Sequence, residues 1–412
     1  MRKKILIFET HPVQYRAPVY QAIEKEHPGQ IEVVYASDFS VRGYKDAGFG
    51  ASFSWDVPLL SGYPNRVLGN ETARGIQHWR GLTGRGVGTL IDEVQPNAVL
   101  LHSFSYLFDW AAYLSALRRR IPVWIRMETQ DEAFERGKLK SWLRSLIYRT
   151  IYAGVSKAFY IGELNRMHLL AHGIAPAQLV PALYCTPDPV GHLSTTEKAL
   201  ARATLRTELG IPSAHVVVAF FGKLTPKKDP ELIIAALRGL SVATQSRVTC
   251  LFVGSGELEA TLREQARQIE NGLGIRTVFA GFINQSRLAS YYLASDVLVL
   301  PSRRMGETWG LVVNEGLQAG CSVVVSEAVG SNRNFGGWER VRVIPVSDAA
   351  RLSRAIEELA ALPRDFDWAR EALRDYSISA AADSILLALC EQRSNAAPTE
   401  DTDDQFPEGK RQ

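Results

Sequence analysis

A lysine-rich loop is the first feature of this sequence whose residue types and spacing could do chemistry. Gly222, Lys223 and Lys228 directly follow the apolar run Val216–Phe221. A loop between a strand and a helix points backbone N–H groups and the helix dipole at an anion. Two ammonium groups five residues apart could then flank a diphosphate as point charges. The alternative is a solvated turn with ordinary surface lysines, because exposed Lys is the rule.

Two glutamates eight residues apart form the second candidate group. Glu307 and Glu315 follow the apolar run Val297–Leu300. We expect Glu307 in the loop at the carboxyl end of a sheet, where α/β proteins bind ligands, and Glu315 in a helix that begins at about Gly310. A carboxylate suits sugar and ribose recognition because it accepts hydroxyl hydrogen bonds that are charge-assisted. The alternative is that Glu307 supports the helix N-terminus and Glu315 is solvated.

Short β-rich apolar runs with amphipathic helical stretches between them must position these residues. The runs lie at residues 4–8, 31–35, 98–101, 123–126 and 158–161 in the first half, and at 216–221, 248–253, 277–280, 297–300, 322–325 and 341–344 in the second. Strands that are buried on both faces and joined by helices indicate parallel βαβ units. The sequence therefore predicts an α/β fold with two doubly wound, Rossmann-like halves.

The length of 412 residues favours two or three domains over one. Pro, Gly and small polar residues interrupt the strand and helix pattern at 185–195, which predicts a boundary near residue 190. We expect an N-terminal domain at 1–190, a C-terminal domain at 191–375, a helix at 376–391 and a disordered tail at 392–412. The tail has almost no large apolar side chains and an acidic patch, so it cannot offset its ordering entropy.

Composition narrows the classes of function. Lys and Arg number 47 against 44 Asp and Glu, and the formal charge of +3 is too small for a dedicated nucleic-acid binder. The four cysteines are 65, 71 and 69 residues apart, which predicts neither a metal knuckle nor a disulfide framework and fits a reducing cytosol. The stretch 98–117 approaches membrane-span length, but a central Asp109 costs about 2.5–3.5 kcal/mol on insertion scales. We expect a strand, a polar turn and a helix there.

Glycine pairs invite a dinucleotide-binding interpretation that the spacing does not support. After Gly254 and Gly256, the third glycine of the fingerprint would fall at Glu259, and after Gly84 and Gly86 it would fall at Thr89. A Rossmann dehydrogenase is therefore disfavoured.

The order of the motifs in the second half resembles the retaining glycosyltransferases of family 4. The array runs from the loop 222–228 through 253–257, 280–283 and 294–302 to Glu307, Glu315 and Gly320, and covers about residues 205–335. The Glu-x7-Glu signature is intact, whereas Lys223 stands where the family usually has Arg, so a bidentate clamp becomes a single ammonium. The resemblance implies a GT-B fold: two Rossmann-like doubly wound domains that face a central crevice, with the helix at 376–391 crossing back to the first domain.

The resemblance also implies roles for these residues. Lys223 and Lys228 would hold the diphosphate of a nucleotide-sugar donor and neutralise its growing charge. Glu307 would contact the sugar and Glu315 the ribose. The other residues placed around the donor are Gly222 in the lysine-rich loop, Phe282 and Ile283 near the base, and Trp309, Gly310 and Leu311 through backbone N–H groups. No protein nucleophile is assigned, and no metal or other cofactor is implied because the lysines take the role of a divalent ion.

The acceptor side departs from the common family pattern, because the loop after the first strand lacks the Gly-rich sequence that many members have. His11, Tyr15 and Arg16 in this loop, together with Gln14, are candidates to contact the acceptor or a donor phosphate. His102 and Glu128 end later strands on the same side, and Glu128 is a candidate to orient the attacking hydroxyl. For each of them the alternative is an ordinary, hydrogen-bonded loop residue.

Residues 137–149 have the pattern of a basic amphipathic helix. Such a helix can lie on an anionic bilayer with Trp142 at the interface. The alternative is an ordinary domain helix whose apolar stripe packs on the sheet.

We therefore expect a retaining glycosyltransferase that moves a sugar from a nucleotide-sugar donor to a hydroxyl on a glycan or lipid-linked acceptor. It would act in glycan or glycolipid biosynthesis, in the cytoplasm or peripherally at the inner face of the membrane, without nucleic acid as a partner. The alternatives are a nucleotide-sugar epimerase of the same fold, a non-catalytic GT-B partner subunit and a peripheral membrane scaffold.

Overall fold

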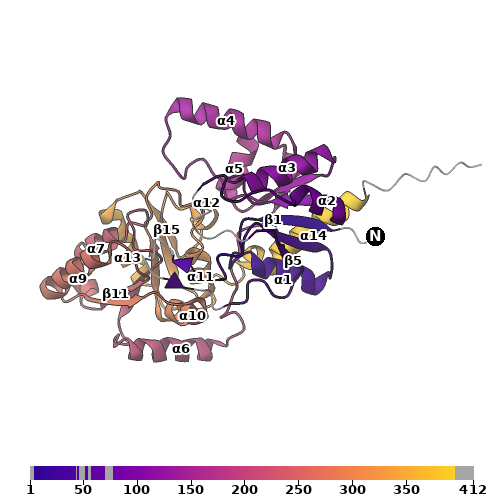
Figure 1. Ribbon diagram of the computed structural model, residues 1–412. Coiled ribbons are helices and arrows are strands. Elements are labelled where there is room, and N and C mark those ends of the chain that lie inside the picture. The colour runs from indigo at the N-terminus through magenta and orange to yellow at the C-terminus, as the bar shows by residue number, and fades with distance from the viewer. Residues whose placement is uncertain (1–3, 43, 46–51, 54–56, 70–77, 395–412) are drawn as a thin grey trace, which may run out of the picture.

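A computed structural model describes residues 4–42, 44–45, 52–53, 57–69 and 78–394 (Figure 1). The chain forms two large sheets in which every neighbouring strand pair is parallel. The first sheet has seven strands in the order β5-β2-β1-β6-β7-β8-β9, and the second has six in the order β12-β11-β10-β13-β14-β15. The predicted α/β fold with two doubly wound halves is confirmed.

In the first half, four strands of the sheet are short, fully buried apolar runs, as expected for parallel strands that are covered on both faces. Its strands are β1 (Ile5–Glu9), β2 (Ile31–Tyr35), β5 (Asn65–Val67), β6 (Ala98–Leu101), β7 (Val123–Ile125), β8 (Val155–Tyr160) and β9 (Leu179–Pro181), beside a small antiparallel pair, β3 (Tyr44–Lys45) and β4 (Ser52–Phe53). Its helices are α1 (Ala17–Glu26), α2 (Val87–Val94), α3 (Leu107–Arg118), α4 (Lys138–Tyr152) and α5 (Glu163–Ala171). The stretch 98–117 is a strand, a turn and a helix, as predicted.

The second half also consists of parallel strands joined by helices. Its strands are β10 (Val216–Phe221), β11 (Val248–Val253), β12 (Arg276–Gly281), β13 (Val297–Leu300), β14 (Ser322–Ser326) and β15 (Val341–Ile344). Its helices are α6 (Thr195–Glu208), α7 (Glu231–Arg238), α8 (Val242–Gln245), α9 (Glu259–Leu273), α10 (Gln285–Ala294), α11 (Val312–Gln318), α12 (Asn332–Phe335) and α13 (Ala349–Ala360). The α6 helix is closed by a capping box in which Ser194 and Glu197 bond each other's backbone N–H groups.

The strand order places both candidate loops at equivalent points. β1 lies between β2 and β6, and β10 lies between β11 and β13, so the chain changes direction across the sheet beside each of these strands. Such switch points leave a crevice outside the carboxyl ends of the strands. The loop after β1 carries His11 to Arg16, and the loop after β10 carries Gly222 to Lys228. Each half therefore contributes one switch-point loop.

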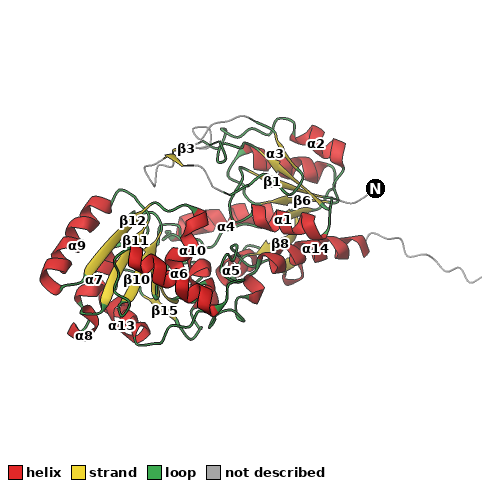
Figure 2. Cartoon of the chain, turned by 90° about the horizontal axis from the view of Figure 1, so that it is seen from below, coloured by secondary structure: helices red, strands yellow, loops and turns green. Residues whose placement is uncertain are grey.

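The C-terminal helix α14 (Ile378–Ser394) returns to the first half of the chain, where it lies beside α1 (Figure 2). Ala382, Ile385 and Leu389 belong to the same buried apolar cluster as Ile5 and Tyr20. Residues 392–394 are helical, so the tail that was expected from residue 392 is wrong at its first three positions. Residues 395–412 lie outside the described residues. The boundary near residue 190 falls between the two sheets and stays a prediction.

The apolar stripe of α4 is exposed. Leu139, Trp142, Leu143, Leu146 and Ile147 keep between 47% and 69% of their surface in contact with solvent. Only Ile151 and Tyr152, at the end of the helix, are buried. The interpretation of α4 as a helix that packs its stripe on the sheet is therefore wrong, because the helix lies outside the sheet layers (Figure 1). None of the helices in the described ranges is long and apolar enough to cross a membrane.

Candidate active site

The loop after β10 is shaped by close backbone packing. Gly222 has a φ of 139°, in a region that favours glycine, and its N–H donates to the carbonyl of Val253 at 2.9 Å. A Cβ on Gly254 would lie 1.9 Å from the Gly222 carbonyl oxygen, and a Cβ on Gly256 would lie 2.5 Å from that of Leu224. Gly254 and Gly256 therefore let two loops pack backbone against backbone. This packing gives the two glycines a role other than dinucleotide binding.

Lys228 and Glu307 form a close ion pair in this loop region. Lys228 Nζ lies 2.5 Å from Glu307 Oε2, and Ser302 Oγ donates to the same oxygen at 3.2 Å. Glu307 is buried, and burial alone would raise its pKa, but the charges of Lys228 and Lys227 hold the pKa below its usual range. Lys227 also donates to the Gly306 carbonyl at 2.9 Å, and its pKa is lowered by burial. The carboxylate thus stays charged among lysines.

Glu315 belongs to a second group that does not touch the Lys228 pair. Its carboxylate accepts hydrogen bonds from Tyr292 Oη at 2.6 Å and from Gln285 Nε2 at 3.3 Å, both on α10. Burial raises the pKa of Glu315 against the effect of these two hydrogen bonds. Glu315 and Leu311 line a cleft of ≈ 380 Å³ between the two halves, together with Tyr15 and Pro58. The two glutamates of the Glu-x7-Glu pair therefore face different partners.

The remaining donor-side candidates lie around these groups. Phe282 and Ile283 are half-buried in the loop between β12 and α10. Trp309 is buried and donates from Nε1 to Asn314 Oδ1 at 2.8 Å. Gly310 has a φ of 95°, and α11 begins at Val312, two residues later than expected. Because α11 has only seven residues, its dipole adds little, and backbone contacts from Trp309 to Leu311 stay a prediction.

A buried charge network lies on the opposite face of the crevice. Arg16 bridges two carboxylates: Nη1 donates to Glu9 at 2.5 Å, and Nη2 donates to Glu128 at 2.7 Å. Tyr20 donates to the second oxygen of Glu9 at 2.5 Å. Burial raises the pKa of Glu9, whereas Arg16 and Tyr184 lower the pKa of Glu128 against its burial. Glu128 is thus held ionised at the crevice surface.

The two candidate histidines are held neutral beside this network. His102 Nε2 lies 3.0 Å from Tyr20 Oη, and His102 Nδ1 lies 2.9 Å from the Arg126 carbonyl. Burial and the charge of Arg16 lower the pKa of His102 well below its usual value, and they lower the pKa of His11 to about 4. Neutral imidazoles can accept a proton from, or donate one to, a ligand hydroxyl.

Tyr184 connects the two faces of the crevice. Its hydroxyl donates to Glu128, and its ring meets Tyr15 at 5.4 Å and Trp309 at 5.7 Å between centroids. Its backbone carbonyl accepts from Asn314 Nδ2 at 2.9 Å, one residue before Glu315. A single residue thus touches the acceptor-side carboxylate and the helix that carries the donor-side carboxylate.

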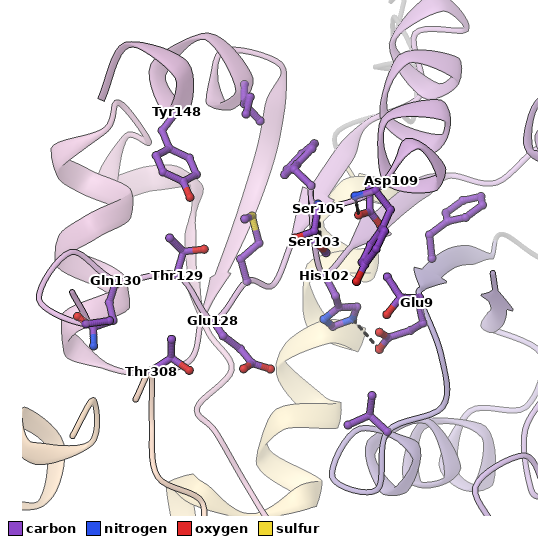
Figure 3. A pocket seen from close by; sticks show the side chains of 18 of the residues that line it. Glu9, His102, Ser103, Ser105, Asp109, Glu128, Thr129, Gln130, Tyr148 and Thr308 are labelled. Atoms are coloured by element: carbon purple, nitrogen blue, oxygen red, sulfur yellow. Dashed lines mark hydrogen bonds and ion pairs between the residues drawn. The ribbon is translucent and has the colours of Figure 1, made fainter. Parts of the chain in front are cut away.

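The five acceptor-side candidates line one cavity of ≈ 680 Å³. These residues are His11, Tyr15, Arg16, His102 and Glu128. Figure 3 shows two of them, His102 and Glu128, in this cavity. Thr308 lines the same cavity from the second half, and Arg144, Ile147 and Tyr148 line it from α4. The two halves close around this cavity where Gly306 N donates to the Ala133 carbonyl at 2.8 Å. The structure therefore brings the acceptor-side candidates together.

Several residues at the site were not singled out from the sequence. They are Glu9, Tyr20, Tyr184, Lys227, Gln285, Tyr292 and Asn314. Lys227 belongs to the lysine-rich loop and Glu9 ends β1 directly before the other candidate loop, so both could have been included by position. Tyr184 contacts Glu128 across 56 positions, and no local spacing signals such a pair.

Comparison with known proteins agrees with the geometry of the second half. The family model described as "Glycosyl transferases group 1" matches residues 201–379. A D-inositol 3-phosphate glycosyltransferase from Streptomyces griseus is 30% identical over 332 residues, which cover 72% of this chain and 68% of that protein. The chain belongs to the glycosyl transferases group 1 family.

Other curated relatives match this group 1 chain over a smaller share of their length. The enzyme of the same name from Streptomyces bingchenggensis is 26% identical over 64% of this chain and 59% of its own length. A phosphatidyl-myo-inositol mannosyltransferase from Mycolicibacterium smegmatis is 33% identical over 36% of each chain. The chain thus spans about half the length of several relatives that it matches.

Solved structures establish the GT-B fold for this group 1 chain. The crystal structure of Anabaena HepE in complex with UDP matches with a TM-score of 0.67 and 16% identity, over 94% of this chain and all of that one. An α,α-trehalose-phosphate synthase (UDP-forming) from Burkholderia vietnamiensis matches with a TM-score of 0.66 and 15% identity, over 97% of this chain and all of that one. At identities of 16% and 15%, these structures show the fold alone.

Proposed function

We propose that the protein is a retaining glycosyltransferase that transfers a sugar from a nucleotide-sugar donor to a hydroxyl acceptor. The observation that carries the proposal is the Lys228–Glu307 pair at the switch point of the second sheet, among Lys223 and Lys227. Both residues lie within 201–379, the part of the chain that the family model matches, which supports the proposal. We also propose that Glu315 binds the ribose, since its carboxylate borders the cleft between the halves.

The chemistry that we propose is stabilisation of the leaving group. As the glycosidic bond breaks, negative charge grows on the diphosphate, and preorganised ammonium groups lower the barrier without reorganising. An ammonium has three N–H donors, so Lys228 can keep Glu307 as a partner and still donate to a phosphate oxygen. Glu307 holds Lys228 in place, and its carboxylate can accept hydrogen bonds from sugar hydroxyls.

A nucleotide-sugar panel tests the proposed activity. The full chain is incubated with UDP-, GDP-, ADP- and TDP-sugars, and free nucleotide, epimers and products are measured. A transferase releases nucleotide faster when an acceptor is present, an epimerase forms an isomer without release, and a scaffold or partner subunit does neither. UDP-glucose is the first donor to test, because one of the HepE structures contains it. The anomeric configuration of the product then decides between retention and inversion.

The Glu307→Gln variant assigns the activity to the site. The substitution keeps the side-chain shape and removes the charge that pairs with Lys228, so turnover should fall at least about 10²-fold. Glu339→Gln is the matched control, because the Glu339 side chain is 77% exposed. Equal rates in Glu307→Gln and the wild type would remove Glu307 from the site.

For the acceptor, we propose a molecule with an anionic or polyhydroxylated head and an apolar part. Arg16, Arg136 and Arg144 line the ≈ 680 Å³ cavity, and Phe134 and Ile147 line it beside them. The relatives named above act on inositol phosphate and phosphatidyl-myo-inositol, which makes both compounds suitable first acceptors. A lipid-linked acceptor predicts that the phosphatidyl compound is used more efficiently than the free headgroup.

We further propose that α4 meets the membrane surface that presents the acceptor. Its exposed apolar residues alternate with exposed Lys138, Lys140 and Arg149, and the helix has no acidic residue. Ile147 belongs to both the exposed stripe and the cavity lining, so a lipid held at α4 would lie at the cavity mouth. An amphipathic basic helix of this kind binds anionic lipid through buried apolar area and charge together.

Vesicle sedimentation tests the membrane contact. The full chain should pellet with vesicles of phosphatidylglycerol and phosphatidylcholine more than with phosphatidylcholine alone, and less as salt is raised. Leu146→Gln should weaken the binding, whereas Leu200→Gln on α6 is the control, since Leu200 is 67% exposed at a distant site. Equal binding of both variants, or no binding by the wild type, would exclude α4 as the contact while leaving the transferase assignment intact.

A further inference from the structure

A cluster of two histidines and an aspartate lies beneath α4 and is not used by the proposed reaction. His168 is in the last turn of α5, and His172 follows four residues later as its C-terminal cap residue. Asp131 lies in the loop after β7, and its side chain is 43% exposed, whereas both histidines are buried. The cluster therefore joins α5 to the loop that follows Glu128.

The three side chains bring one potential ligand atom each close together. His168 Nδ1 lies 3.0 Å from Asp131 Oδ2, and His172 Nε2 lies 3.2 Å from the same oxygen. The ligand atoms of all three residues lie within 4.8 Å of one another. A tetrahedral zinc ion with bonds of about 2.0–2.1 Å holds its ligand atoms about 3.3 Å apart, so small shifts would suffice.

The second atoms of these groups are already oriented by neighbours. His168 Nε2 lies 3.0 Å from Tyr152 Oη, and His172 Nδ1 lies 3.1 Å from Ser145 Oγ. Arg144 donates to the other oxygen of Asp131. Metal-binding histidines and carboxylates usually have such partners on the atom that faces away from the ion, because these contacts fix the orientation of each ligand.

We propose that Asp131, His168 and His172 form a binding site for a divalent transition metal of the zinc class. Two imidazole nitrogens and one carboxylate oxygen are the donor set that such ions prefer over magnesium or calcium. The exposed edge of Asp131 leaves a path for entry and a fourth position for water. The ion would tie α5 to the loop 129–137, which forms one wall of the large cavity, and the contact of His172 with Ser145 would hold α4 beside them. This inference does not depend on the transferase activity.

Metal titration of the full, tag-free chain tests the site. After treatment with EDTA and dialysis, calorimetry with zinc chloride should give one ion per chain, and cobalt should give the visible spectrum of a tetrahedral site with nitrogen and oxygen ligands. His172→Gln should weaken zinc binding more than about tenfold. His27→Gln is the matched control, because His27 is an exposed histidine at the end of α1.

The melting temperature with zinc and a second variant, Ser145→Ala, test the site further. Excess zinc should raise the melting temperature of the wild type but not that of His172→Gln, since an ion that binds only the folded state stabilises it. If His172→Gln does not fold, Ser145→Ala, which removes only an orienting hydroxyl, should weaken binding by about tenfold or more. The proposal is overturned if the wild type binds no zinc, or if a folded His172→Gln or Ser145→Ala binds it as well as the wild type does. Cys390 has an exposed thiol, whereas Cys185, Cys250 and Cys321 are buried. A cobalt spectrum with thiolate ligation that Cys390→Ser removes would also overturn the proposal.

Discussion

The two faces of the crevice are built by different means. On the second half, Gly222, Gly254 and the Lys228–Glu307 pair are set by loops that follow neighbouring strands of one sheet. On the first half, Arg16 is held by Glu9, which ends β1 directly before the loop, and by Glu128, which lies 112 positions away. The proposed donor face therefore rests largely on backbone geometry between neighbouring strands, while the proposed acceptor face rests on side-chain contacts between distant parts of the chain.

The electrostatics of the two faces also differ. Burial favours the neutral form of both Glu307 and Glu9, but the lysines hold the pKa of Glu307 low, whereas the pKa of Glu9 stays raised. The donor face thus keeps an excess of ammonium groups for an anion. The acceptor face balances one guanidinium between two carboxylates and surrounds them with tyrosines, an arrangement suited to hydroxyl groups.

Lys228→Met should give the largest effect, because it should lower kcat strongly while leaving the KM for the acceptor almost unchanged. Removing this ammonium takes away charge stabilisation of the leaving diphosphate, so kcat should fall about 10²–10³-fold. The KM for the acceptor should change little, because the acceptor face keeps its own contacts. Steady-state kinetics with Lys25→Met, an exposed lysine on α1, is the control. Full activity in Lys228→Met would place the diphosphate elsewhere.

Arg16→Gln should lower the free energy of unfolding, because it removes the cation of the charge network on the acceptor face. The substitution leaves the buried carboxylate of Glu9 and the partly buried one of Glu128 without their cation, which should lower the free energy of unfolding by about 3 kcal/mol. Urea unfolding measures this change, with Arg351→Gln on the exposed side of α13 as the control. A difference between the two variants below about 0.5 kcal/mol would mean that the network carries little energy.

His11→Asn should change how stability depends on pH. Burial and Arg16 lower the pKa of His11 from 6.5 to about 4. Between these values the unfolded chain binds a proton that the folded chain does not, so stability falls as the pH falls, by roughly 2–3 kcal/mol for this group. The variant should lose that part of the slope in urea unfolding from pH 7 to pH 4. An unchanged slope would contradict a neutral, buried His11.

Lys223→Arg should have the smallest effect. A guanidinium can bind a phosphate through two parallel hydrogen bonds where an ammonium binds as a point charge, so donor affinity should rise about two- to tenfold. Calorimetry with UDP measures the change, and acceptor KM should stay the same. Weaker UDP binding in this variant would show that the loop is shaped for Lys223 itself.

The sequence predicted the elements that local pattern controls and missed those that depend on distant contacts. The buried apolar runs identified the inner strands, because only parallel strands bury such runs on both faces. The short strands β5 and β9 at the sheet edges were missed, since neither is a buried apolar run, whereas the equally short β7 is fully buried and was predicted. Tyr184 was not predicted as a site residue because its partners, Glu128 and Asn314, are 56 and 130 positions away in the sequence.

The sequence pattern of α4 predicted the helix correctly but did not determine which surface its apolar stripe faces. The basic amphipathic pattern predicted the helix, but whether its stripe faces the sheet or the outside depends on where the chain places it. Likewise, the four-residue spacing of His168 and His172 is visible in the sequence, whereas Asp131 joins them only through the fold.

A crystal structure of the full chain with UDP-glucose tests the central claim most directly. The account predicts a diphosphate within hydrogen-bonding distance of Lys228 Nζ at the carboxyl end of β10, the ribose at Glu315 and the sugar between Glu307 and the large cavity. A nucleotide bound away from Lys228, or seated against Arg16 on the opposite face, would contradict the division of the crevice into a donor face and an acceptor face.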